Sequence, residues 1–243
     1  MTEPREVVIT GGGTGIGYAA AALFAKAGDN VTITGRRETV LSEAATLLGA
    51  RYVAFDAADP AAVQKALADL PQRVDVLVNN AGGNTDRQRE APAEGDLAGL
   101  ADAWHANLDA NVLTAVLVTA GLKPRFADNA RIVTVGSIAA KQGSGSYGAS
   151  KSAVEAWNID LARQLAGRGI AANVIAPGVT TDTEFFHGTL TDEWLKPRVA
   201  LALNKRAGRP EEVADAIFYL ASPGVAHITG QVIHINGGAY SGR

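Results

Sequence analysis

The feature that most restricts the fold of this chain is a regular alternation of short β-branched runs with longer alanine-rich segments. Most of the β-branched runs are almost continuously apolar, which is typical of parallel strands that are covered on both faces. The alanine-rich segments have helical character, so the alternation predicts successive βαβ units. The predicted strands end at Thr10, Thr34, Phe55, Asn79, Val135, Ile175 and Ile235. The predicted helices begin near Gly15, Glu38, Pro60, Asp96, Ser146 and Pro210.

These units predict an α/β fold, a doubly wound, Rossmann-like parallel sheet of seven strands between two helix layers. Such a three-layer αβα sandwich places its ligand crevice at the carboxyl ends of the strands. A chain of 243 residues without an internal repeat or a low-complexity linker is expected to form one domain, residues 1–243. Functional residues are therefore sought directly after the strands.

Composition excludes several classes of function. A net charge of −3 provides no basic field for nucleic acid or an anionic membrane surface. No apolar run is long enough for a membrane span and no signal peptide is visible, so a cytoplasmic protein is expected. The absence of cysteine excludes disulfides, thiolate nucleophiles and sulfur-ligated metals. The histidines have no metal-ligand spacing, and no metal is predicted; they are His105, His187, His227 and His234.

The segment after the first predicted strand reads TGGGTGIG, from Thr10 to Gly17, and opens the first helix. Glycines at such a position let backbone N–H groups approach a pyrophosphate at the positive end of the helix dipole. A glycine-rich turn without a ligand is the simpler alternative. The strand-to-helix context favours nucleotide binding.

The second predicted strand ends in TGRRE, where a dinucleotide-binding fold commonly has an acid for the ribose hydroxyls. Gly35 takes that place and is followed by Arg36 and Arg37. Two guanidinium groups suit a 2′-phosphate, which predicts NADP, with NADPH preferred over NADH. The alternative is a solvated charge pair at a helix start, although arginine there opposes the helix dipole.

Two further strand ends carry candidate cofactor contacts. Asp56 could accept a hydrogen bond from the adenine amino group or cap the next helix, a role that Asp59 before Pro60 suits better. The segment NNAG, Asn79 to Gly82, lies at the predicted switch point of the sheet. Small residues there allow a flat ligand to approach the chain closely.

Tyr147 and Lys151 are four residues apart in SYGASK, so on a helix they share one face. An unperturbed phenol with a pKa near 10 is a poor base at neutral pH. An ammonium about 4 Å away contributes about 4 kcal/mol at an effective dielectric near 20, before the opposing cost of burial. We therefore expect Lys151 to lower the pKa of Tyr147.

Together these motifs resemble the short-chain dehydrogenase/reductase family, in its single-domain form. The resemblance runs from Val7 to Gly238. The residues that carry it are Thr10, Gly11, Gly15, Gly17, the NNAG segment, Asn111, Ser137, Tyr147, Lys151, Pro177 and Gly178. Their order and spacing are more specific than any one motif.

The resemblance implies roles for these positions. Tyr147 is the implied general acid or base, Ser137 orients the carbonyl oxygen, and Lys151 also holds the nicotinamide ribose. Asn111 is implied to hold a water that links Lys151 to solvent, although it could also be a polar break in a long helix. The implied cofactor contacts are Gly11, Thr14, Gly15, Ile16, Gly17, Arg36, Arg37, Asp56, Asn80, Ala81, Gly82, Tyr147, Lys151, Pro177, Gly178 and Thr181.

The chain departs from the family pattern in two places. Ser137 and Tyr147 are 10 positions apart, about three fewer than is common in the family, which leaves open a substrate role for Ser144 or Ser146. After Pro177-Gly178 the family usually has a threonine for the nicotinamide carboxamide, and both Thr181 and Thr183 are candidates here.

Residues 182–209 interrupt the βαβ alternation, and in this family the region forms a small lid over the substrate. The apolar residues expected to line it, or else to pack on the body or on a partner subunit, are Phe185, Phe186, Trp194 and Leu195.

The expected activity is NADP-dependent interconversion of a ketone and a secondary alcohol. The alternatives are a β-ketoacyl-carrier reductase and a catalytically idle regulator that senses the cofactor. The resemblance and the alanine-rich helices from Asp96 and Ser146 also predict a homotetramer.

Overall fold

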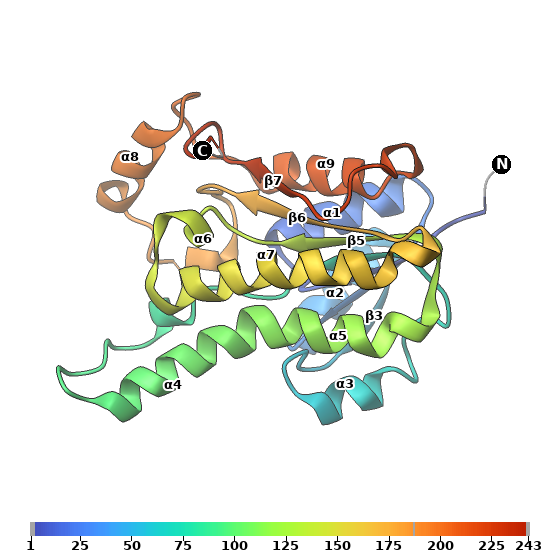
Figure 1. Ribbon diagram of the computed structural model, residues 1–243, viewed down its shortest axis with the longest axis horizontal. Coiled ribbons are helices and arrows are strands. Elements are labelled where there is room, and N and C mark those ends of the chain that lie inside the picture. Colours follow the sequence, from blue (N-terminus) through green and yellow to red (C-terminus); the bar gives the residue numbers. More distant parts are fainter. Residues whose placement is uncertain (1–2, 187, 242–243) are drawn as a thin grey trace.

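The computed structural model describes residues 3–186 and 188–241, and a seven-stranded parallel sheet forms its centre (Figure 1). The strands lie in the order β3-β2-β1-β4-β5-β6-β7. Their bounds are β1 Glu6–Thr10, β2 Asn30–Gly35, β3 Arg51–Ala54, β4 Val74–Asn79, β5 Phe126–Val135, β6 Ala171–Pro177 and β7 Val232–Ile235. The strand order reverses at β1 and β4, which defines the switch point of a doubly wound sheet. The predicted fold class is confirmed.

Helices cover both faces of this sheet (Figure 1). Their bounds are α1 Gly15–Lys26, α2 Glu38–Leu48, α3 Pro60–Ala66, α4 Leu97–Leu108, α5 Thr114–Leu122, α6 Ala139–Gln142, α7 Gly145–Leu165, α8 Asp192–Leu201 and α9 Pro210–Leu220. Helices α1, α2 and α9 pack against one face, and α3, α5 and α7 pack against the other. Helix α8 extends from the end of the molecule at which β6 ends.

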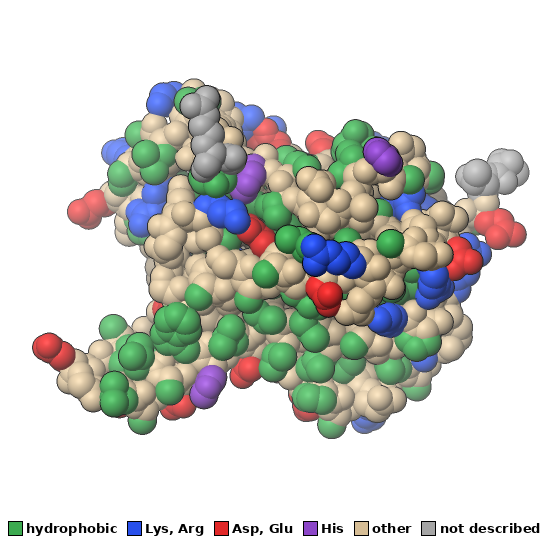
Figure 2. All heavy atoms as spheres, in the orientation of Figure 1, with side chains coloured by type: hydrophobic (Ala, Val, Ile, Leu, Met, Phe, Trp, Pro, Cys, Tyr) green, Lys and Arg blue, Asp and Glu red, His purple; other side chains and the backbone are tan. Residues whose placement is uncertain are grey.

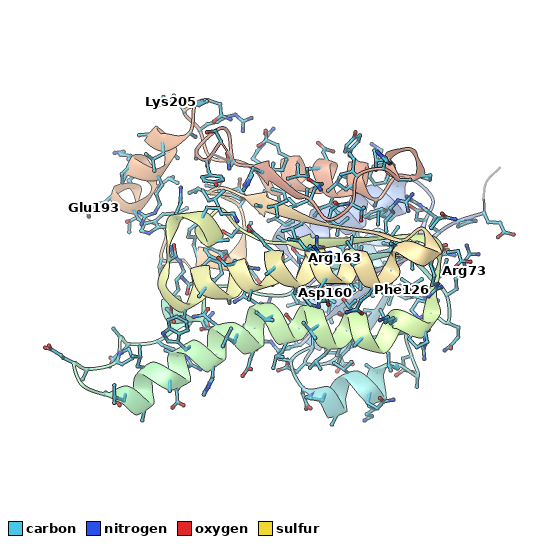
Figure 3. All side chains as sticks on the ribbon, viewed as in Figure 1. Arg73, Phe126, Asp160, Arg163, Glu193 and Lys205 are labelled. Atoms are coloured by element: carbon cyan, nitrogen blue, oxygen red, sulfur yellow. The ribbon has the colours of Figure 1, made fainter. Side chains whose placement is uncertain are left out.

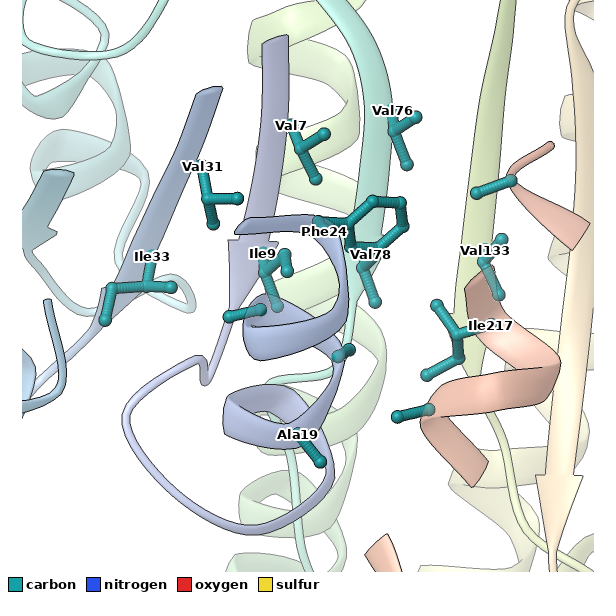
Figure 4. Packing of buried hydrophobic residues seen from close by; sticks show 14 of the residues in the cluster. Val7, Ile9, Ala19, Phe24, Val31, Ile33, Val76, Val78, Val133 and Ile217 are labelled. Atoms are coloured by element: carbon teal, nitrogen blue, oxygen red, sulfur yellow. The ribbon is translucent and has the colours of Figure 1, made fainter. Parts of the chain in front are cut away.

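Alternation along the central strands supplies a core to each helix layer. Val7 and Ile9 of β1 pack with Phe24 of α1 (Figure 4), whereas Val8 faces the opposite cluster with Leu122 of α5. All five side chains are fully buried. This two-sided burial explains why the strands read as continuous apolar runs rather than as alternating ones.

Capping carboxylates explain where α3 and α4 begin. Asp59 caps α3 by accepting a hydrogen bond from the Ala61 N–H at 2.8 Å, directly before Pro60. Asp96 caps α4 through the Gly99 N–H at 2.9 Å. A carboxylate at the cap satisfies an N–H group that has no partner within the helix.

The long helix expected from Asp96 differs in one respect from the structure. A π-helical turn, Asp109–Leu113, separates α4 from α5 and contains Asn111. Such turns often occur at functional sites, and no helix-periodicity signal distinguishes them in a sequence. Within the described residues, no helix combines the length and apolar character needed to cross a membrane.

Candidate active site

A cavity of about 1620 Å³ lies at the carboxyl ends of the strands, where the sequence analysis placed the ligand crevice. The predicted site residues that line it are Gly11, Thr14, Gly15, Ile16, Arg36, Arg37, Asp56, Asn80, Ala81, Gly82, Ser137, Tyr147, Lys151, Pro177 and Gly178. Three predicted residues, Gly17, Asn111 and Thr181, do not line it. The volume is sufficient for a dinucleotide together with a small substrate.

The loops after β1 and β4 are joined by hydrogen bonds at the switch point. The buried Thr10 hydroxyl accepts from the N–H groups of Asn80 and Ala81, each at 2.9 Å. The Asn80 side chain donates in return to the carbonyl oxygens of Thr10 and Gly11. These contacts hold the glycine-rich loop open towards the cavity.

Gly17 is required for this arrangement although it does not face the cavity. A Cβ at position 17 would lie 2.2 Å from the Gly11 carbonyl oxygen and 2.5 Å from the Asn80 amide nitrogen. Only glycine therefore lets α1 begin so close to the loop. Gly11 itself has φ +65°, a left-handed conformation that also favours glycine.

The two arginines after β2 lie at the cavity and differ in their contacts. Arg37 forms an ion pair with Glu184, whose carboxylate also accepts a hydrogen bond from the Thr14 hydroxyl at 3.0 Å. This contact raises the pKa of Arg37. Arg36 is exposed at the cavity. Gly35 places no acid at the strand end, so the residues fit a 2′-phosphorylated ribose there.

Tyr147, Ser137 and Lys151 converge at the inner part of the cavity. Tyr147 and Lys151 lie on α7 and are both buried. The Lys151 Nζ lies 5.9 Å from the centre of the Tyr147 ring. Ser137 follows β5, lines the same cavity, and acts on the Tyr147 phenol, whose pKa it lowers by hydrogen bonding. The Lys151 Nζ donates to the Val135 carbonyl oxygen at 2.9 Å, which anchors it to the end of the strand.

The direction of the Tyr147 pKa corrects our expectation. Burial raises the pKa of Tyr147 to about 12, and the hydrogen bond with Ser137 and the charge of Arg87 oppose this rise without reversing it. Burial also lowers the pKa of Lys151 to about 8. Removing a phenolate from water costs more than these neighbours recover, so Tyr147 stays protonated at neutral pH.

Asn111 in the π turn fastens the loop after β4 instead of lining the cavity. Its side chain accepts from the Gly83 N–H at 3.1 Å and donates to the carbonyl oxygens of Gly83 and Asn107, each at 2.9 Å. A Cβ on Gly82 would lie 2.7 Å from the Asn111 Oδ1 and 3.5 Å from the Lys151 Nζ. Asn111 and Lys151 therefore meet at Gly82, and a water between them stays a prediction.

For three positions the sequence left alternative roles open, and the structure shows which of the residues line the cavity. Thr183 lines the cavity, whereas the N–H of Thr181 donates to the Gly208 carbonyl oxygen at 3.0 Å. This placement favours Thr183 for a contact with the nicotinamide carboxamide. Ser144 lines the cavity, whereas Ser146 is held by Asp86. Asp56 lines the cavity while its carboxylate accepts from the Ala58 N–H at 2.9 Å.

Aromatic side chains from residues 182–209 form one wall of the cavity. Phe185 lies 5.8 Å from Tyr147 between ring centres, Phe186 lies 5.2 Å from Phe185, and Trp194 lies 5.1 Å from Phe186. All three line the cavity, and Leu195 does not. The wall extends directly from the phenol, so a substrate at Tyr147 would contact it.

Comparison with known proteins is consistent with this geometry. The family model described as enoyl-(acyl carrier protein) reductase matches residues 11–240, nearly the whole chain. The chain belongs to the short-chain dehydrogenase/reductase family. The resemblance read from the sequence is thereby confirmed, as is the assignment to a family of oxidoreductases.

Individual members of the short-chain dehydrogenase/reductase family align over almost the full chain. The 3-oxoacyl-(acyl-carrier-protein) reductase FabG of Vibrio cholerae is 32% identical, with 98% of each chain covered. Sulfoacetaldehyde reductase 2 of Chromohalobacter salexigens is 37% identical, covering 89% of this chain and 88% of the relative. A short-chain dehydrogenase of Burkholderia cenocepacia, solved in complex with NADP, is 29% identical with a TM-score of 0.85 and 98% of each chain covered.

One cavity residue of this short-chain dehydrogenase/reductase was missed by the sequence analysis. Arg87 lies in a 3₁₀ turn, Thr85–Gln88, and its guanidinium carbon lies 5.5 Å from the ring centre of Phe185, 4.9 Å from Phe186 and 4.7 Å from Trp194. In the sequence, Arg87 stands in an ordinary charged loop, TDRQRE. No pattern there indicates that Arg87 contacts aromatic residues about 100 positions later in the sequence.

The turn that carries Arg87 is fixed by hydrogen bonds between Asp86 and the buried Asn107 and Ser146. Asp86 accepts from the Asn107 side chain at 2.9 Å and from the Ser146 hydroxyl at 3.2 Å, and Asn107 accepts from the Thr85 N–H. Ser146 directly precedes Tyr147. Within the described residues, no group of three His, Cys, Asp or Glu side chains could hold a metal ion; His187 lies outside them.

Proposed function

We propose that this chain is an NADPH-dependent carbonyl reductase in which Tyr147 donates the proton to the substrate oxygen. The observation that carries the proposal is the convergence of Tyr147, Ser137 and Lys151 at the inner end of a cavity that begins at a glycine-rich loop. When bound, the reduced nicotinamide supplies a hydride to the carbonyl carbon. The protein supplies the proton and holds the substrate carbonyl in position for the hydride.

The raised pKa of Tyr147 is compatible with a role as proton donor. A phenol with a pKa of about 12 is protonated at neutral pH, so it holds a proton that it can give to the substrate oxygen. In this proposal Ser137 donates a hydrogen bond to the same carbonyl oxygen and so polarises the carbonyl bond. Asn111 holds the Gly82–Gly83 backbone at Lys151, and we assign it the relay water that returns a proton to the site.

The cofactor of this chain is NADP(H). The glycine-rich loop fits a pyrophosphate, and the solved relative with bound NADP covers 98% of the chain. Arg36 is the residue that we assign to the 2′-phosphate, because Arg37 is already paired with Glu184. Lys151 has further ammonium N–H groups besides the one bonded to Val135, and these suit the nicotinamide ribose hydroxyls.

Residues 182–209 act as a lid over the substrate in this proposal, and residues 1–243 act as one domain. The substrate is a ketone or an aldehyde, and the β-ketoacyl thioesters suggested by the FabG relative form the second candidate class. A cytoplasmic location stays a prediction.

The deciding experiment follows NADPH oxidation at 340 nm over ketones, aldehydes and an acetoacetyl thioester. Turnover with wild type and its loss in Tyr147→Phe would support a reductase, and the preferred acceptor would separate the two substrate classes. Tight NADPH binding without turnover on any acceptor would instead indicate a regulator that senses the cofactor.

We also propose a homotetramer, since hydrophobic side chains gather over α4 and α5 in Figure 2. The exposed large apolar residues of α4, the π turn and α7 are Leu97, Leu100, Trp104, Leu113 and Ile159. Trp104 is 42% exposed and Leu97 is 76% exposed, which is unfavourable unless another subunit covers them. A second copy of the chain is the natural partner in a symmetric assembly.

A further inference from the structure

Among the described residues, Arg87 at the substrate end of the cavity is a cation without an acidic partner. Arg87 is half-buried, and burial is the main cause that lowers its pKa, followed by repulsion from Arg198. Within residues 3–186 and 188–241, no carboxylate pairs with Arg87. A partly desolvated guanidinium without a counter-ion is costly unless something else stabilises it.

The carboxylates nearest to Arg87 in the sequence or at the cavity, Asp86 and Glu184, bind other residues. Asp86, the preceding residue, points its carboxylate at Asn107 and Ser146. Glu184 pairs with Arg37 and also binds Thr14. The side chains that face Arg87 are instead three aromatic rings, with a weak contact to the Thr189 hydroxyl at 3.4 Å. Ring faces stabilise a cation and leave its N–H groups available to a ligand.

Arg87 lies one aromatic side chain away from the catalytic Tyr147 that we propose. Phe185 contacts both the Arg87 guanidinium, at 5.5 Å, and the Tyr147 ring, at 5.8 Å. Arg87 is also the charged group that acts on the Tyr147 pKa. Arg198, whose guanidinium carbon lies 4.0 Å from the Trp194 ring centre, adds positive charge to the same wall.

We propose that Arg87 binds an anionic group of the substrate, a carboxylate or a sulfonate, while the substrate carbonyl lies at Tyr147. This proposal rests on the proposed reductase activity and specifies the substrate class. A small oxo acid or oxo sulfonate would place its anion against the guanidinium and its carbon chain along Phe185. Arginine suits this task because its fork of N–H groups matches two oxyanion oxygens.

The first test compares two β-keto substrates that differ in charge. Acetoacetate and methyl acetoacetate are reduced by wild type with NADPH, and the ratio of their kcat/KM values is determined. Arg87→Gln should lower this ratio about 10- to 100-fold, the loss expected for one charge-assisted contact. Arg87→Lys, which keeps the charge but not the fork, should lower it less.

The control variant removes an arginine that lies outside the cavity. Arg163 is exposed on α7 and does not line the cavity (Figure 3). Arg163→Gln changes the net charge by the same amount and should leave the ratio at the wild-type value. If Arg87→Gln slows both substrates by equal factors, Arg87 only supports the aromatic wall, and the proposal is overturned.

The second test needs no turnover, so it separates failure of this proposal from failure of the reductase assignment. Trp194 lies beside Arg87 and contributes, with Trp104 and Trp157, to the tryptophan fluorescence. This fluorescence is followed during titration of the NADP-saturated protein with ethanesulfonate or with the neutral ethyl methyl sulfone. Wild type should respond to the sulfonate alone, and Arg87→Gln should lose that response. Equal responses to both compounds, or none in wild type, would overturn the anion site even if Arg87→Gln cannot be produced folded.

Discussion

Arg37 and Glu184 form an ion pair across the cavity, joining the residue that precedes α2 to the segment that follows β6. Glu184 also binds Thr14 of the glycine-rich loop, so one carboxylate contacts two of the segments assigned to the cofactor. Both partners are about half exposed, so the pair itself stabilises the fold little. Its main consequence is that Arg37 is already neutralised at the place where a 2′-phosphate is expected.

Arg36 should therefore determine the preference for NADPH. Arg36→Ala is expected to raise the KM for NADPH about 10- to 100-fold, because it removes a charge-assisted contact, and to change the KM for NADH little. Arg37→Ala is the matched variant and should have a smaller effect. Steady-state kinetics with both cofactors checks this, and a wild type that uses NADH as efficiently as NADPH would contradict the assignment.

Tyr147→Phe tests proton donation while leaving the shape of the cavity almost unchanged. Turnover should fall by a factor of about 100 or more, since the variant lacks the phenolic proton of Tyr147, while NADPH affinity is retained. Fluorescence titration of NADPH alongside turnover measures the two effects separately. A variant that keeps turnover within threefold of wild type would refute the role of Tyr147.

The buried ammonium of Lys151 should make stability depend on pH. The pKa of lysine is 10.5 ordinarily, as in the unfolded chain, and about 8 in the folded protein. Between these values the unfolded chain binds one proton more, so the free energy of unfolding rises with pH, and the cost of burial is fully present below pH 8. Tyr147 opposes this only above pH 10, because its folded pKa of about 12 exceeds its ordinary value.

Urea unfolding followed by circular dichroism at pH 7 to 10 measures this effect. Wild type should gain about 2 kcal/mol of unfolding free energy between pH 8 and pH 10. Lys151→Met should lack that component, since it has no proton to release. Parallel profiles for the two proteins would show that Lys151 is not buried in its charged form.

Trp104→Glu tests the proposed assembly. A charge in the apolar surface formed by α4 and the π turn should dissociate the tetramer, because burying an unpaired carboxylate between subunits is costly. Light scattering at micromolar protein concentration should give a tetrameric mass for wild type and a smaller one for the variant. A monomeric wild type would refute the assembly directly.

The sequence alone determined the elements and most of the cavity lining. Val7, Val8 and Ile9 read as a buried parallel strand because both of their faces meet a helix layer. The i, i+4 spacing of Tyr147 and Lys151 placed both on one face of a helix without tertiary information. Strands, helices and glycine-rich turns depend mainly on residues that are close in the sequence, and for this reason they could be predicted from it.

Only the tertiary structure decided which long-range partners meet. Glu184 reaches Arg37 across 147 positions, and Phe185 and Trp194 lie beside Arg87 although about 100 positions separate them in the sequence. The π turn at Asn111 lies where its side chain makes two hydrogen bonds to Gly83 in the loop after β4. The pKa of Tyr147 rises because burial, a property of the whole fold, outweighs nearby charges. Desolvation and pairing between distant segments depend on packing, which sequence spacing does not encode.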